Sequence, residues 1–147
     1  MLMLHLVSGS LVLLCGFVSV LSVKGEKLHR RAGNVFFASM VSLSLSAAYL
    51  EIRLEDFPIM GLLSLYFAST SWVTVTRPTG QIGYFELGAF FVISCIAIMF
   101  FKWGWDIAYN GKPLAGTMPL ALYFVWGSIS AVAAIMDIKM ILQKGIA

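Results

Sequence analysis

Two histidines are the side chains in this sequence best suited to chemistry, because imidazole carries protons near neutral pH and often ligates haem iron. His5 lies near the start of the first apolar segment, and His29 lies just past its end. At about 1.5 Å of helical rise per residue, the step from His5 to His29 predicts a separation of about 36 Å. We therefore expect that the two imidazoles cannot hold one iron atom within one chain.

A mixed site of imidazole and thioether ligands stays open, since these ligands suit Cu(I) or haem iron. Methionine is also an ordinary filler of apolar packing, and the methionines here have no tight ligand spacing. The first interpretation is therefore no cofactor, with haem or copper at His5 as the alternative. The candidate ligands are His5, Met60 and Met118, with Met1, Met3 and Met99 expected in the same half of the membrane.

A second set of polar side chains is expected at the opposite membrane boundary. The run from Lys24 to Arg31 is a tight basic turn, and Glu86 and Asp137 are predicted to arrive at its level. A carboxylate at a membrane boundary needs a cation, which Arg30, Arg31 or Arg77 could supply. We predict a structural clamp between helices, with a proton or anion relay through His29 as the alternative. The candidate relay or structural residues are His5, His29, Arg30, Arg31, Glu86 and Asp137.

Soluble-type catalysis has no visible residues in this sequence. We find no phosphate-binding glycine loop, nucleophile elbow, metalloprotease helix or pair of carboxylates buried at one level. Cys15 and Cys95 fall within apolar segments and are expected to be free thiols. We therefore assign no catalytic residue, and an enzyme is the less favoured class.

The composition places these residues in a membrane protein. Hydrophobic residues make up 60% of the 147 residues and charged residues 12%, whereas about a quarter of the residues in soluble domains are charged. The mean hydropathy is +0.91, and crossing hydrocarbon as a helix takes about 20 apolar residues. We predict an all-α, polytopic transmembrane helical bundle, a single domain over residues 1–147. Its five spans are predicted at about 2–23, 32–50, 58–76, 82–101 and 114–136.

The first and fourth predicted spans each allow two interpretations. The first lacks a basic start and a clear cleavage site, so we expect a retained helix rather than a secretory signal. In the fourth, only residues 87–101 are uncharged, which covers about 22 Å of a core about 30 Å thick. Extending this span back to Ile82 repairs its length and places Glu86 about one turn inside the helix.

The basic residues of the short loops predict an N-out, C-in orientation, because cytoplasmic loops are enriched in lysine and arginine. The basic turn would then meet anionic lipid headgroups, and we expect no nucleic-acid binding. The expected location is the bacterial cytoplasmic (inner) membrane. The inner side would hold Lys24, Lys27, Arg30, Arg31, Arg77, Lys139 and Lys144, and the outer side Arg53, Lys102 and Lys112.

Small and hydroxylated residues recur at helical spacing, which marks the faces on which helices approach each other in lipid. They predict packing within the bundle and equally permit a homo-oligomer or a membrane partner subunit. The stripes are His5, Gly9, Val12, Gly16 and Ser19 in the first span; Ser39, Ser42, Ser46 and Tyr49 in the second; Gly61, Ser64, Ala68 and Ser71 in the third; and Gly127, Ala131 and Ala134 in the fifth.

The segment after the fourth span has a strand-like pattern. Trp103, Trp105, Ile107 and Tyr109 alternate with period two and run into Asn110-Gly111, which is a strong signal for a hairpin turn. We predict a small hairpin or an aromatic cap at the outer interface. Trp and Tyr also collect at headgroup level without any ligand, and we favour that explanation.

The basic turn carries a resemblance to a known family. It resembles the turn of a bacterial family of predicted integral membrane proteins of unknown function, marked by a histidine in the first span and a K-G-x-x-x-H-R-R-x-G turn. The matching residues are Leu4-His5 and Gly9, then Lys24-Gly25-Glu26-Lys27-Leu28-His29-Arg30-Arg31-Ala32-Gly33, and finally Asp137-Ile138-Lys139-Met140. The resemblance implies a helical membrane fold and no established activity. Longer members continue into further histidine-containing segments, which weakens a redox role for these residues alone.

Two classes of function remain. The first is a non-enzymatic membrane module, which would be a scaffold, a partner subunit or a small transporter. The second is a haem- or copper-binding redox protein that uses His5 and the methionines of the outer half.

Overall fold

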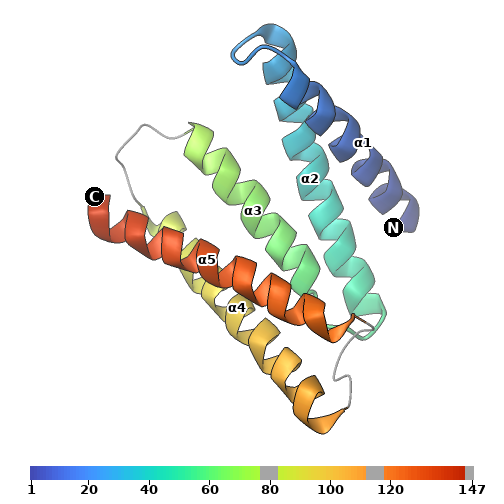
Figure 1. The fold of residues 1–147 in the computed structure, drawn as a ribbon. Coiled ribbons are helices and arrows are strands. Elements are labelled where there is room, and N and C mark those ends of the chain that lie inside the picture. The colour runs from blue at the N-terminus through green and yellow to red at the C-terminus, as the bar shows by residue number, and fades with distance from the viewer. Residues whose placement is uncertain (77–82, 112–117, 145–147) are drawn as a thin grey trace. The chain divides into compact units, whose positions relative to one another are not determined.

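The computed structural model describes residues 1–76, 83–111 and 118–144 (Figure 1). The regular secondary structure of these residues consists of helices, and no strand occurs among them. Each helix is long and apolar enough to cross a membrane, which confirms the predicted all-α fold with five candidate spans. The helices are α1 (Leu2–Leu21), α2 (Lys27–Arg53), α3 (Ile59–Thr76), α4 (Tyr84–Asn110) and α5 (Leu120–Lys144).

The helix ends differ from the predicted spans because polar residues continue two of the helices. α2 begins at Lys27, so most of the predicted basic turn is the first turn of this helix. α4 runs from Tyr84 to Asn110. The fourth span therefore gains its missing length at the C-terminal end, which is Asn110 instead of the predicted residue 101. Its first residue is Tyr84 instead of the predicted Ile82.

The predicted hairpin before Gly111 is wrong, because the chain stays helical as far as Asn110. Trp105 and Tyr109 are one helical turn apart, and their stacked rings have centroids 5.2 Å apart. Gly111 has a φ of 63°, and its N–H donates to the carbonyl oxygen of Ile107 at 3.0 Å. The Asn-Gly pair is therefore the left-handed end of a helix, a conformation that glycine adopts without strain.

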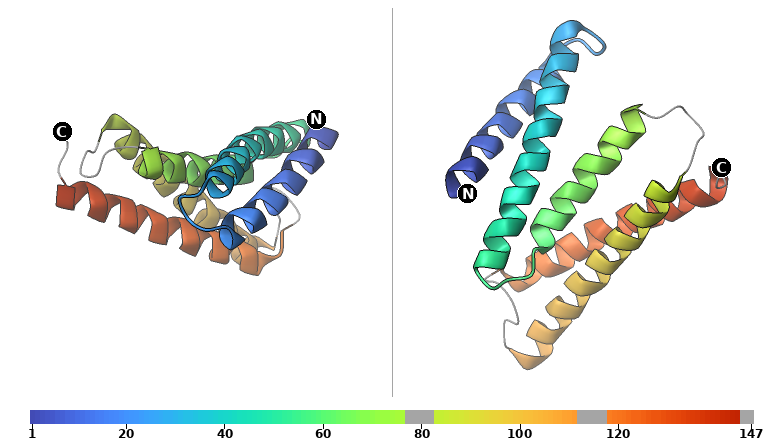
Figure 2. Two further views of the ribbon diagram at one scale, coloured as in Figure 1. Left: turned by 90° about the horizontal axis from the view of Figure 1, so that it is seen from above. Right: turned by 180° about the vertical axis from the view of Figure 1, so that it is seen from behind.

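The helices group into two compact units, Met1–Trp72 and Val73–Ala147. In the first unit, α1 and α2 form an antiparallel hairpin, and the two helices lie side by side in both views of Figure 2. A Cβ atom added at Gly9 would lie 3.6 Å from the Leu43 side chain, and one at Gly16 would lie 3.2 Å from the Phe36 ring. The glycine stripe predicted in the first span is thus confirmed as a packed face.

A close approach in the first unit joins α2 to α3 at Gly61. A Cβ atom added at Gly61 would lie 2.6 Å from both the Cβ and the backbone nitrogen of Ala48. Further along the same pair, the rings of Phe37 and Trp72 stack with centroids 4.2 Å apart. Small residues at a crossing point allow backbones to approach in lipid, where packing rather than water exclusion holds helices together.

The second unit pairs α4 with α5 through two glycines and facing aromatic rings. An added Cβ at Gly104 would lie 3.2 Å from the side chain of Tyr123, and one at Gly127 would lie 3.3 Å from the Phe101 ring. Gly127 is buried as the sequence predicted, while the most enclosed polar residue of α5, Ser130, was not part of the predicted stripe. The side chains of the unit with the least exposure are Ile93, Phe100, Tyr123 and Ser130.

The contact at Gly61 leads to a stability prediction. Gly61→Ala should lower the free energy of unfolding by about 1–3 kcal/mol, because the added methyl group overlaps backbone atoms of Ala48 that cannot move away cheaply. Gly33→Ala is the matched control within the same unit, since a Cβ there meets no atom within 4 Å. Thermal unfolding of the two purified variants in one detergent measures the difference. Equal melting temperatures would contradict the close approach of α2 and α3.

Candidate functional site

His5 is joined to α2 by a hydrogen bond that fixes the state of its ring. Its Nδ1 atom lies 3.2 Å from Ser46 Oγ. The Ser46 hydroxyl donates its only proton to the carbonyl oxygen of Leu43 at 2.9 Å, so it accepts from His5. Nδ1 of His5 therefore carries a hydrogen, and Nε2 holds the lone pair of the neutral ring.

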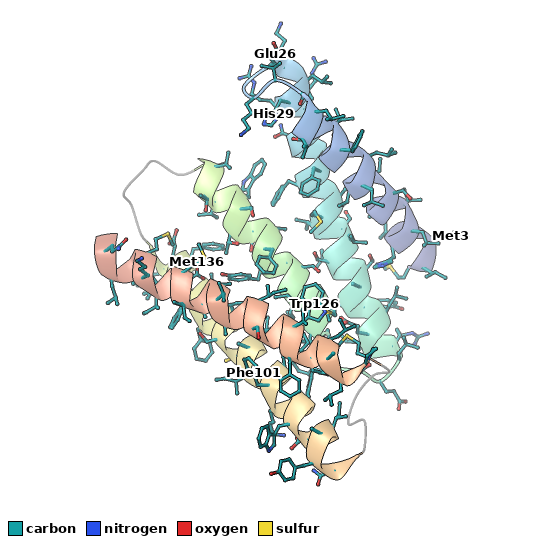
Figure 3. All side chains as sticks on the ribbon, viewed as in Figure 1. Met3, Glu26, His29, Phe101, Trp126 and Met136 are labelled. Carbon is teal, nitrogen blue, oxygen red and sulfur yellow. The ribbon has the colours of Figure 1, made fainter. Side chains whose placement is uncertain are left out.

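His29 is bonded to the other helix of the same hairpin, at the end of α1. Its Nδ1 atom lies 3.0 Å from the carbonyl oxygen of Ser19 and 3.4 Å from Ser22 Oγ. Because a carbonyl oxygen only accepts, His29 Nδ1 is the donor, and its Nε2 is again the lone-pair atom. Figure 3 shows His29 beside the α1–α2 turn, at the opposite end of the hairpin from Met3.

The fold-back of α2 shortens the predicted separation between the two histidines. Since His29 contacts Ser19, the relevant helical rise is that from His5 to Ser19, about 21 Å at 1.5 Å per residue. The larger separation expected from the sequence is wrong because it continued α1 through the turn. Both values exclude one iron atom held by the two rings.

The residues of the K-G-x-x-x-H-R-R-x-G turn have distinct structural roles. Gly25 has a φ of +87°, which few residues other than glycine adopt without strain. His29 bonds to α1, whereas Arg30 and Arg31 are exposed and form no ion pair with any residue in the described ranges. The turn therefore presents two free guanidinium groups beside an anchored imidazole.

The two acidic residues of the predicted clamp belong to the second unit. Glu86 is buried at the start of α4, where its Oε2 atom accepts from the Gly83 N–H at 2.8 Å. A carboxylate in this place satisfies a free N–H group and faces the positive end of the helix dipole. Asp137 lies on α5, and Arg77 lies outside the described residues. The clamp between helices of the two units stays a prediction.

Glu51 is a polar residue of the first unit that lies just past the predicted second span, 32–50. Near the end of α2, its Oε1 accepts from the Met60 N–H and its Oε2 from the Gly61 N–H, both at 3.1 Å. These N–H groups open α3, so one carboxylate ties two helices together. Because the donors are nine and ten residues away, no local capping motif pointed to this contact.

The described residues contain no group of three or more His, Cys, Asp or Glu side chains placed to hold a metal ion. Of the three predicted ligands, His5 and Met60 lie in the first unit and Met118 in the second. The backbone N–H of Met60 donates to Glu51, near the end of α2. Cys15 and Cys95 are free thiols, as predicted.

Comparison with known proteins gave no match to a family model, a curated protein or a solved structure. The resemblance of the basic turn to a membrane protein family therefore stays a prediction.

The contacts of Glu51 lead to a second prediction. Glu51→Gln should lower the free energy of unfolding by about 1–2 kcal/mol, because an amide replaces a charged group that accepts from two N–H donors. Glu55→Gln changes an exposed acid of the same region and should stay within about 0.5 kcal/mol of the parent. Thermal unfolding in detergent compares the two variants. If Glu51→Gln left the melting temperature unchanged, this bridge between α2 and α3 would be ruled out.

Proposed function

We propose that this chain is a non-enzymatic integral membrane module, serving as a scaffold, a partner subunit or a small transporter. The proposed location is the bacterial cytoplasmic membrane, with an N-out, C-in orientation that the basic residues around the α1–α2 turn support. The exposed Arg30 and Arg31 are suited to anionic lipid headgroups, which offer the acceptors that these side chains lack in the described part of the chain.

Two cross-helix hydrogen bonds carry this proposal. His5 of α1 donates to Ser46 of α2, and His29 of α2 donates to Ser19 of α1, so the hairpin is fastened at both ends. In lipid, such side-chain bonds favour one helix register over others. A hairpin held in one register is what a scaffold or subunit needs in order to present a constant surface to a partner.

Asparagine variants that test this role distinguish the effect of Nδ1 from that of Nε2. Asparagine places an N–H donor near the position of Nδ1 but has nothing at Nε2. If the histidines act as fasteners, His5→Ala and His29→Ala should each cost about 1 kcal/mol of stability, while His5→Asn and His29→Asn should keep most of it. Thermal unfolding measures the first effect.

A flux assay completes the same experiment. With parent and variants in liposomes that enclose a pH-sensitive dye, a fastening role predicts equal proton flux for all proteins of equal stability. A flux that falls in His29→Asn without a loss of melting temperature would overturn the fastening role and favour a proton relay through the ring.

A haem- or copper-binding redox protein is the second candidate, and one feature favours it. His5 is anchored through Nδ1 and keeps the Nε2 lone pair, which is the arrangement of many metal-ligating histidines. Met60 belongs to the same unit and supplies a thioether.

A spectrum separates this candidate from the first. We expect the purified protein to be colourless and free of stoichiometric copper or iron, because the described residues place no group of three or more His, Cys, Asp or Glu side chains around His5. Visible absorption and elemental analysis provide the measurement, with His5→Asn as the comparison. A Soret band, or bound copper, that is lost in His5→Asn would establish the redox candidate instead.

A further inference from the structure

A groove of about 420 Å³ runs along the surface of the first unit between α1 and α2. Its walls include apolar residues such as Leu4 and Leu11, but four polar side chains also line it: Ser8, Asn34, Ser39 and Ser42. Every lining residue belongs to the first unit. The groove therefore combines an apolar wall with hydrogen-bonding groups on the face of a candidate membrane span.

Several serines elsewhere in the helices satisfy their hydroxyl groups locally, whereas Ser130 of α5 is buried without a hydrogen-bond partner among the described residues. Ser10, Ser44 and Ser94 each donate to the carbonyl oxygen four residues earlier, as serines in membrane helices commonly do. Within the described residues, by contrast, none of the four groove side chains has a hydrogen-bond partner. Ser8 and Ser39 are nevertheless almost enclosed, at 4% and 7% exposure.

Unpaired polar groups are costly in this setting. In hydrocarbon no water is present to bond them, so an unsatisfied donor or acceptor is strongly unfavourable. A lipid acyl chain could fill the volume of the groove but offers neither donor nor acceptor. The occupant must therefore bring hydrogen-bonding groups as well as apolar surface.

The α2 side of the groove is suited to pack against the same face of another α2 helix. Asn34, Ala38 and Ser42 are spaced four residues apart, so they form one short stripe of small or polar side chains that lets a backbone approach. An amide and a hydroxyl each carry both a donor and an acceptor. Such a face is complementary to itself, which is the requirement for an interface with two-fold symmetry.

We propose that a second copy of this chain closes the groove, with the α2 helices of two parallel copies packed along Asn34, Ala38 and Ser42. A two-fold axis along the membrane normal brings the two Asn34 amides to the same depth, where they pair. The groove hydroxyls then bond across the interface. This dimer does not depend on the role of the histidines, because neither ring lines the groove.

Cysteine cross-linking of the full chain in liposomes tests the proposed geometry. In a background with Cys15→Ala and Cys95→Ala, Ala38→Cys should form a disulfide-linked dimer under mild oxidation. Leu13→Cys is the matched control on α1, since Leu13 is 76% exposed and lies outside the groove. Equal cross-linking at the two positions, at low protein-to-lipid ratio, would overturn the proposal.

Energy transfer between labelled copies, measured over a series of lipid dilutions, tests the hydrogen bonds. Asn34→Ala should raise the dissociation constant of the dimer about three- to tenfold, as expected for one interhelical side-chain bond. Ala38→Phe should abolish the dimer, and its melting temperature reports whether the monomer still folds. Unchanged dissociation in Asn34→Ala would overturn the interface. So would a monomeric parent whose groove holds a small solute detected by mass spectrometry.

Discussion

The requirement that every polar group find a partner inside the protein governs this structure. A helix satisfies its own backbone in hydrocarbon, but its first N–H groups and its polar side chains need other acceptors and donors. Glu51 supplies acceptors to the start of α3, and Glu86 does so at the start of α4. The two histidines use the same principle between α1 and α2. The groove gathers four polar side chains that have no partner among the described residues, which is why it points to a further partner.

Much of the fold was readable from the sequence, because long apolar runs have few alternatives in lipid. The glycines of the first and fifth spans also indicated correctly which faces pack, since small size is itself the cause of close approach. Helix ends were harder to predict. Charged and aromatic residues such as those near Lys27 and Trp105 extend a helix without adding an apolar signal. At Gly111 the same dipeptide fits a hairpin turn and a helix end, and the hydrogen bond from the Gly111 N–H to the Ile107 carbonyl oxygen decides between them.

The candidate site was predictable in its residue types and not in its contacts. A histidine within or beside an apolar span is conspicuous in any sequence, so His5 and His29 could be selected directly. Their partners depend on the register of an antiparallel helix pair, which places Ser46 and Ser19 opposite them. The spacing of residues along a single helix does not predict that register. The bridge from Glu51 and the unpaired serines of the groove are likewise properties of two helices together.

The anchoring of both imidazoles through Nδ1 has a consequence for the freedom of their side chains. A ring that donates to the neighbouring helix cannot turn about its side-chain bonds without breaking that hydrogen bond. The α1–α2 hairpin therefore holds two imidazole rings in set orientations, one near each of its ends.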